Sequence, residues 1–208
     1  MAEEMAENGY VRTSVASVLK RAGVSRRTFY ELFDDKLDCF LSAFDYAGAI
    51  IRNRLLEAAG VKSSAQAGSA SDPAALLEIG IASYLDALAA ELPFAQLFMV
   101  QSHVVGVEAI HRRAKIQESI AHMFAALMGV NGPRGRYACV MFVMAVATKV
   151  TEPVAAGDAE AIRALAPELT GYARDLWDAG VFSDPGHPLR ARRPGGGDPF
   201  AAGGPVAA

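Results

Sequence analysis

The sequence is poor in cysteine and histidine, with two cysteines and four histidines in 208 residues. Two lone thiols, Cys39 and Cys139, argue against a disulfide framework and fit a reducing compartment, so we expect a cytoplasmic protein. The chain also lacks a Gly-rich phosphate loop, a zinc-type cysteine spacing and a Ser-His-Asp order. We therefore predict no enzyme, no catalytic residue, no metal site and no cofactor.

Long hydrophobic runs are missing too, although 52% of the residues are hydrophobic. The richest run, residues 138–150, is shorter than the roughly 20 apolar residues that cross a bilayer. The first ten residues, MAEEMAENGY, have neither the basic nor the apolar region of a signal peptide. These features predict a helix-packed protein that has no membrane partner.

Positive charge is not in excess, since 23 acidic residues outnumber 20 basic ones and the net charge is −3. This balance argues against a protein coated in nucleic acid. The distribution is uneven, however, because the segment 12–30 contains no acidic residue. Its five cations are Arg12, Lys20, Arg21, Arg26 and Arg27. A basic window in an acidic chain indicates a nucleic-acid contact confined to one face.

Apolar periodicity predicts a short helix at the start of this window. The stripe consists of Val15, Val18, Leu19 and Ala22, at the spacing of one helix face. Thr13 or Ser14 is placed to cap its beginning, and Gly23 to end it in the left-handed conformation.

A second helix is predicted over residues 26–32, with Ser25 as its N-cap. Phe29 and Phe33 would share a buried face, and Arg26 and Tyr30, also four residues apart, an exposed one. Two short helices around a glycine turn, with cations on the first turn of the second, predict a helix-turn-helix.

The run from Thr13 to Lys36, TSVASVLKRAGVSRRTFYELFDDK, closely resembles the DNA-binding signature of TetR-family transcriptional regulators. The glycine turn, the capping serine, Thr-Phe-Tyr, the second Phe and the Lys fall in register over roughly residues 1–45. Leu19 departs from the family's usual Ala. We expect a three-helix domain over 1–46 whose first helix, in residues 1–8, is only the end of the family's longer one.

The resemblance implies that the helix from Arg26 enters the major groove of an operator, as part of a homodimer on pseudo-palindromic DNA. Arg26, Arg27 and Tyr30 would read bases, and Thr13 and Lys36 would hold phosphates. Glu31 could accept a hydrogen bond from the N4 amino group of cytosine, or it could be an ordinary solvated residue. The predicted DNA-binding set is Thr13, Ser25, Arg26, Arg27, Thr28, Tyr30 and Lys36.

The rest of the chain predicts an all-α fold with a C-terminal helical bundle over 47–182. Expected helices cover residues 37–58, 74–91, 94–102, 106–129, 134–151 and 159–165, and a last one ends at 179. Residues 60–72 would be a loop, and 183–208, rich in Pro and Gly, a disordered tail.

By resemblance, the bundle holds a ligand pocket and a dimer interface. The predicted pocket residues are Tyr84, Phe94, Phe98, Met99, His103, Met123, Phe124 and Met144, since Met and aromatic side chains line apolar cavities. The same pattern is also that of an ordinary core. The predicted dimer interface is Val140, Val143, Ala147, Leu169, Tyr172, Leu176 and Trp177.

One feature is typical of a different function. Glu108 and His111 have the Glu-x-x-His spacing of di-iron helix bundles. Such a site needs a second copy of the motif, which the sequence lacks.

The sequence therefore predicts a ligand-responsive regulator, a repressor released from its operator by a small apolar effector. The alternative is a TetR-like ligand-binding and dimerisation module without specific DNA binding.

Overall fold

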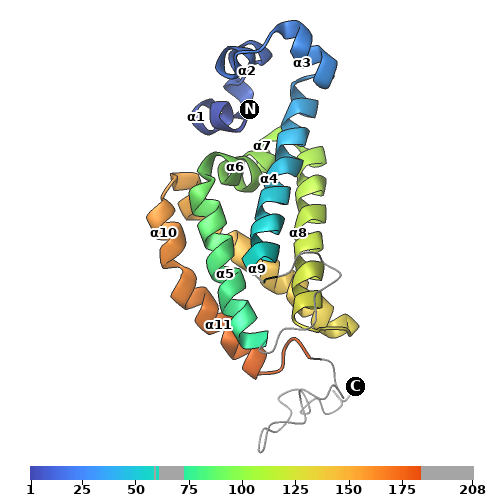
Figure 1. The fold of residues 1–208 in the computed structure, drawn as a ribbon, viewed down its shortest axis with the longest axis vertical. Coiled ribbons are helices and arrows are strands. Elements are labelled where there is room, and N and C mark those ends of the chain that lie inside the picture. The colour runs from blue at the N-terminus through green and yellow to red at the C-terminus, as the bar shows by residue number, and fades with distance from the viewer. Residues whose placement is uncertain (59, 61–72, 184–208) are drawn as a thin grey trace, which may run out of the picture.

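The computed structural model describes residues 1–58, 60 and 73–183, and all regular elements among them are helices (Figure 1). The all-α prediction is confirmed. Nearly all of the predicted loop over 60–72 and of the predicted tail over 183–208 lies outside the described residues. Helices α1 to α3 sit at one end of an elongated bundle, and α4 runs from this end along the bundle (Figure 1).

Three short helices form the N-terminal end: α1 (Ala2–Arg12), α2 (Val15–Ala22) and α3 (Arg26–Leu32). Within α1 the backbone leaves the helical region at Gly9, where φ is 70°. Gly23 ends α2 in the left-handed conformation, with φ 68°, which a residue without a Cβ adopts at little cost. The predicted glycine turn between two short helices is therefore present.

Most helices of the bundle follow the prediction closely. Their bounds are Lys36–Ala58 for α4, Pro73–Ala90 for α5, Val107–Leu127 for α8, Pro133–Ala156 for α9, Ala159–Ala164 for α10 and Ala166–Asp178 for α11. The predicted end of the helix at residue 151 is wrong, because α9 continues through Pro153.

Proline inside a helix costs about 3 kcal/mol because one backbone hydrogen bond is lost. Val150 and Val154 on the same helix are completely buried, and the Gln96 side-chain amide donates to the Val154 carbonyl at 3.1 Å. Packing on both sides of Pro153 thus holds the last turn in place.

The expected helix over 94–102 is divided into three elements. These are α6 (Leu92–Gln96), a π-helical turn η2 (Leu97–Gln101) and α7 (Ser102–Val105). The chain then turns at Gly106, whose φ of 121° is open to glycine alone among common residues. A π-helical turn is rare, and such turns often occur at functional sites.

One hydrophobic core joins the N-terminal helices to the bundle. Met5 of α1 is completely buried and belongs to the same cluster as Phe40, Phe44 and Phe98. The Phe44 and Phe98 rings stack with centroids 4.7 Å apart. The N–H of Tyr10 also donates to the Gln101 side chain at 3.1 Å. Helix α1 is therefore fixed to η2 as well as to α2.

Candidate DNA-binding surface and apolar cavity

The exposed face of α3 carries the side chains predicted to read bases. Arg26, Arg27 and Tyr30 are all exposed, and half of the Tyr30 side-chain surface is accessible. The ring of Phe29 behind Tyr30 is buried. Arg27 is paired with Glu31 at 2.8 Å, whereas Arg26 has no partner among the residues that the structure describes. Arg26 is thus the cation of this face that is ready for a ligand.

The beginning of α3 is fixed by its own side chains. The Ser25 hydroxyl accepts from the Thr28 N–H at 3.1 Å, as predicted for an N-cap, and lies 2.9 Å from the Thr28 hydroxyl. Both hydroxyls therefore hold the first turn of α3, and DNA contacts of these two residues stay a prediction.

Thr13 and Lys36 have structural partners where phosphate contacts were expected. Thr13 is buried and its hydroxyl donates to the Gly9 carbonyl at 2.8 Å, so Ser14 is the N-cap of α2. The Lys36 ammonium donates to the carbonyls of Tyr10 and Thr13, each at 3.0 Å, and lies 4.0 Å from the Tyr10 ring centroid. These side chains tie the end of α1 to the start of α4.

Arg21, counted as part of the basic window, is neutralised by α1. Its guanidinium donates to Glu4 at 2.7 Å and to Glu7, and Glu3 lies 3.8 Å away. The hydrogen bond from Arg21 lowers the pKa of Glu4 below its ordinary value. These acidic partners lie 14 to 18 residues before Arg21 in the sequence. The local periodicity that predicted the helices gives no information on contacts over such a separation. The cationic surface is therefore narrower than the sequence suggested.

The geometry of α2 and α3 agrees with a comparison of the chain against protein-family models. Residues 2–43 match the model described as "Bacterial regulatory proteins, tetR family". The N-terminal part of this chain belongs to the tetR family. The match supports a DNA-binding transcriptional regulator, as the quoted signature implied. Neither the curated proteins nor the solved structures contain a match to the chain.

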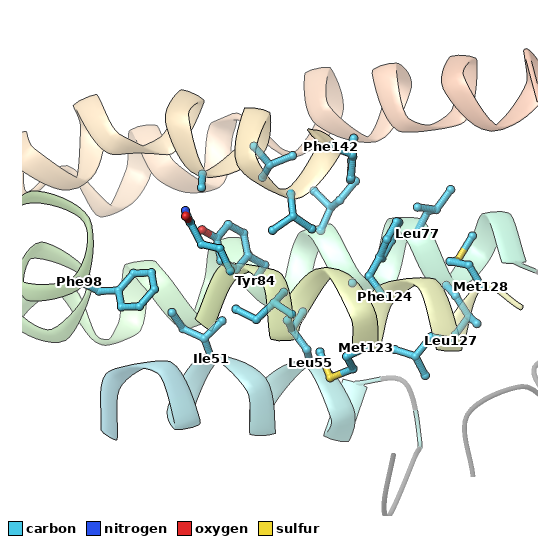
Figure 2. A pocket seen from close by; sticks show the side chains of 18 residues that line it. Ile51, Leu55, Leu77, Tyr84, Phe98, Met123, Phe124, Leu127, Met128 and Phe142 are labelled. Atoms are coloured by element: carbon cyan, nitrogen blue, oxygen red, sulfur yellow. The ribbon is translucent and has the colours of Figure 1, made fainter. Parts of the chain in front are cut away.

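Beyond the tetR-family domain, the bundle contains an elongated, partly open apolar cavity of about 90 Å³ (Figure 2). Helices α4, α5, α8 and α9 and the turn η2 form its wall. The labelled side chains in Figure 2 are Ile51, Leu55, Leu77, Tyr84, Phe98, Met123, Phe124, Leu127, Met128 and Phe142. The wall has two polar side chains, those of Tyr84 and Gln117.

Four of the eight predicted pocket residues line this cavity, namely Tyr84, Phe98, Met123 and Phe124. The other four do not. Phe94 packs against Tyr46 with ring centroids 5.5 Å apart, and Met99 is completely buried in the core. His103 and Met144 are exposed. Sequence periodicity groups residues by helix face, but it does not say which face borders an empty space.

The residues predicted for a dimer interface do not lie together on one surface. Tyr172 and Leu176 line an outer groove of about 400 Å³ between α9 and α11, together with Tyr137 and Met141. Three others lie elsewhere, since Val143 and Ala147 line the inner cavity and Leu169 is buried in the core.

The remaining two residues predicted for the interface are neither exposed in the outer groove nor fully buried. Val140 is half-buried on α9, and Trp177 is half-buried against Phe182, with ring centroids 6.3 Å apart.

Helix α9 is unusual for its apolar surface. Within the described ranges it is the one helix that is long and apolar enough to cross a membrane by length and composition. A third of its most apolar window is buried in the bundle, and core helices pass the same test. Tyr137, Met141 and Met144 remain exposed along it.

Glu108 and His111 lie on the exposed surface of α8, where Arg112 is 3.8 Å from Glu108 and 2.6 Å from Asp45. In the part of the chain that the structure describes, no group of three or more His, Cys, Asp or Glu side chains is arranged to hold a metal ion.

Proposed function

We propose that this protein is a cytoplasmic, homodimeric repressor that leaves a pseudo-palindromic operator when an apolar effector enters the cavity. The observation that carries the proposal is the tetR-family match over a helix-turn-helix whose second helix exposes Arg26, Arg27 and Tyr30. In this motif the second helix lies in the major groove. Residues 1–46 would be the DNA-binding domain and 47–182 the effector and dimer domain.

Arg26 is the residue we assign to base reading. A guanidinium can form two hydrogen bonds with O6 and N7 of guanine, and its loss costs about 1 to 3 kcal/mol at that base pair. Arg27 is 88% exposed in its side chain but shares its charge with Glu31, so we expect a weaker contact. Tyr30, one turn further along α3, would contact a phosphate or a thymine methyl group.

The partner of the outer groove would be a second copy of this chain. Tyr137, Met141 and Tyr172 are between 49% and 66% exposed and lie on two neighbouring helices, α9 and α11. Two copies meeting here would bury the apolar face of α9 and set two α3 helices about one DNA turn apart. Replacing Met141 and Tyr172 by glutamate should give a monomer in analytical ultracentrifugation, whereas a dimer with unchanged affinity would move the interface elsewhere.

Effector binding would reach the DNA-binding helices by two routes. Helix α4 carries Ile51 and Leu55 into the cavity wall and begins directly after α3. Phe98 of η2 also lines the cavity, and Gln101 at the end of η2 holds the Tyr10 N–H of α1. An effector that prefers the released form about 100-fold would supply roughly 3 kcal/mol of coupling.

The test is selection of bound fragments from a random double-stranded DNA pool, at low and then at moderate salt. We expect a pseudo-palindromic consensus for the wild type, loss of that consensus for Arg26→Ala, and no change for Arg54→Ala. Arg54 is a matched control because it is an exposed arginine near the opposite end of α4 from α3.

Phosphate contacts alone give binding that has no consensus sequence and is lost as the salt concentration rises. Such a result would contradict operator recognition. The protein would then be a ligand-binding and dimerisation module.

A further inference from the structure

Two polar side chains in the cavity wall, Tyr84 and Gln117, are free to form hydrogen bonds. Neither the Tyr84 hydroxyl nor the Gln117 amide forms a hydrogen bond with any residue in the ranges 1–58, 60 and 73–183. Burial raises the pKa of the Tyr84 hydroxyl above its ordinary value, yet the side chain keeps some accessible surface. A side chain that is both deep and partly accessible faces internal space. Both side chains are half-buried and line the cavity, so each can form a hydrogen bond with a ligand there.

The apolar and polar side chains of the wall are unevenly placed along the cavity. Tyr84 lies toward the Phe98 end, while Leu77, Leu127 and Met128 lie at the other end (Figure 2). A ligand that fits both ends therefore has one polar head group and an apolar tail. The head group would lie beside η2, the turn whose Gln101 side chain is bonded to α1.

Charge near the polar end selects the kind of head group. Arg113, one turn before Gln117 on α8, donates to the Met99 carbonyl at 3.1 Å and lies 2.6 Å from His103 Nε2. Its Nε is buried without a partner, and no carboxylate among the described residues is paired with it. This positive charge lies close enough to interact with the Tyr84 hydroxyl. A ligand amine would be repelled here.

A carboxylate head group is also disfavoured. The two groups that face the cavity are neutral, and Arg113 is not part of the wall. An ionised carboxylate would lose its water shell without gaining a direct ion pair. A neutral carbonyl oxygen loses less on entering and can accept from both Tyr84 and Gln117.

The volume limits the length of the tail. A water molecule needs roughly 10 to 15 Å³ of cavity volume, and a methylene group occupies about the same volume as a water molecule. A cavity of about 90 Å³ therefore holds roughly six to nine non-hydrogen atoms.

We propose that the cavity binds a neutral medium-chain carbonyl compound, such as a ketone or ester, whose oxygen accepts hydrogen bonds from Tyr84 and Gln117. This inference rests on the proposed effector-binding function and adds the chemical class of the effector to it.

The experiment compares four seven-carbon probes: 2-heptanone, heptanoate, heptylamine and heptane. Dissociation constants come from thermal-shift titrations of the full chain at pH 7. We expect 2-heptanone to bind best. One neutral hydrogen bond corresponds to a factor of about two to ten in affinity. Tyr84→Phe and Gln117→Leu should each lower the affinity for 2-heptanone by this factor and leave the affinity for heptane unchanged.

Gly80→Leu is the control that blocks the cavity. Gly80 lines it, and a Cβ at this position would have no atom within 4 Å. The added side chain should fill the space and abolish binding of all four probes. Unliganded melting curves verify that each variant is folded.

The possible failures are distinct. Equal affinity for all four probes, or unchanged 2-heptanone binding in both polar variants, overturns the head-group inference while cavity binding stands. Tighter binding of heptanoate overturns the neutral head group. No shift with any probe contradicts the effector-binding function itself.

Discussion

Two helical glycines, Gly80 and Gly135, have different surroundings. Replacing Gly80 by alanine should stabilise the protein, whereas replacing Gly135 by alanine should destabilise it. Gly80 lies inside α5 beside the cavity, and a Cβ there would have nothing within 4 Å. Gly135 lies in the first turn of α9, and its Cβ would be 2.3 Å from the Phe182 carbonyl oxygen and 2.5 Å from a methyl of Val130. The chemical change is the same in both variants.

At Gly80 the helix propensity decides the result. Alanine in a helix interior is favoured over glycine by about 0.5 to 1 kcal/mol, since less backbone entropy is lost on folding. The new methyl group meets no atom, so packing neither adds to this gain nor opposes it. A stabilisation of this size raises the melting temperature of a chain this long by roughly 1 to 4 °C.

At Gly135 the clash decides it. One of the two contacts is with a backbone oxygen, which cannot turn away as a side chain can. Overpacking of this kind costs about 1 to 3 kcal/mol, equivalent to a melting temperature lower by roughly 2 to 12 °C.

The assay is thermal and urea unfolding of Gly80→Ala and Gly135→Ala beside the wild type, at one protein concentration and without added ligand. A destabilised Gly80→Ala would mean that the space beside α5 is already filled. A Gly135→Ala variant as stable as the wild type would mean that the segment at Phe182 can move aside, and either result would refute the reasoning from close contacts.

Two further predictions concern the N-terminal helices. Lys36→Met should cost about 1.5 to 3 kcal/mol in urea unfolding, because the ammonium loses its bonds to the Tyr10 and Thr13 carbonyls; weaker DNA binding with unchanged stability would instead indicate a phosphate contact. The bond from Arg21 lowers the pKa of Glu4, so its stabilisation is present above the ordinary value of 4.5 and is lost as the pH falls through the folded value. Melting temperatures between pH 3 and 6 should therefore fall less steeply in Glu4→Gln than in the wild type, and parallel curves would contradict this assignment.

Local signals in the sequence predicted the helix-turn-helix in detail. Gly23 adopts the left-handed conformation, Ser25 caps α3, Phe29 is buried, and Arg26 and Tyr30 are exposed. Each of these outcomes depends on residues within four positions along the chain. Propensity and spacing are enough to determine such features.

Features that depend on distant parts of the chain were not predicted. The pairing of Arg21 with Glu4 joins two helices, and the Lys36 ammonium reaches back 26 residues to Tyr10. Pro153 remains helical because Val150 and Val154 are buried against other helices. Local propensity assigned Pro153 to a break, and tertiary packing overrode it. For the same reason the cavity wall was only half identified.

The burial of α1 against the bundle bears on how this protein can be engineered. Met5 shares a core with Phe44 and Phe98, and Gln101 accepts from the N–H of Tyr10. Residues 1–46 are therefore not an interchangeable cassette. A chimaera that joins them to another regulator at residue 46 would expose Met5 and lose the acceptor for Tyr10, unless the recipient also received the α6–η2 segment. A graft limited to the exposed face of α3 would alter recognition and leave this junction intact.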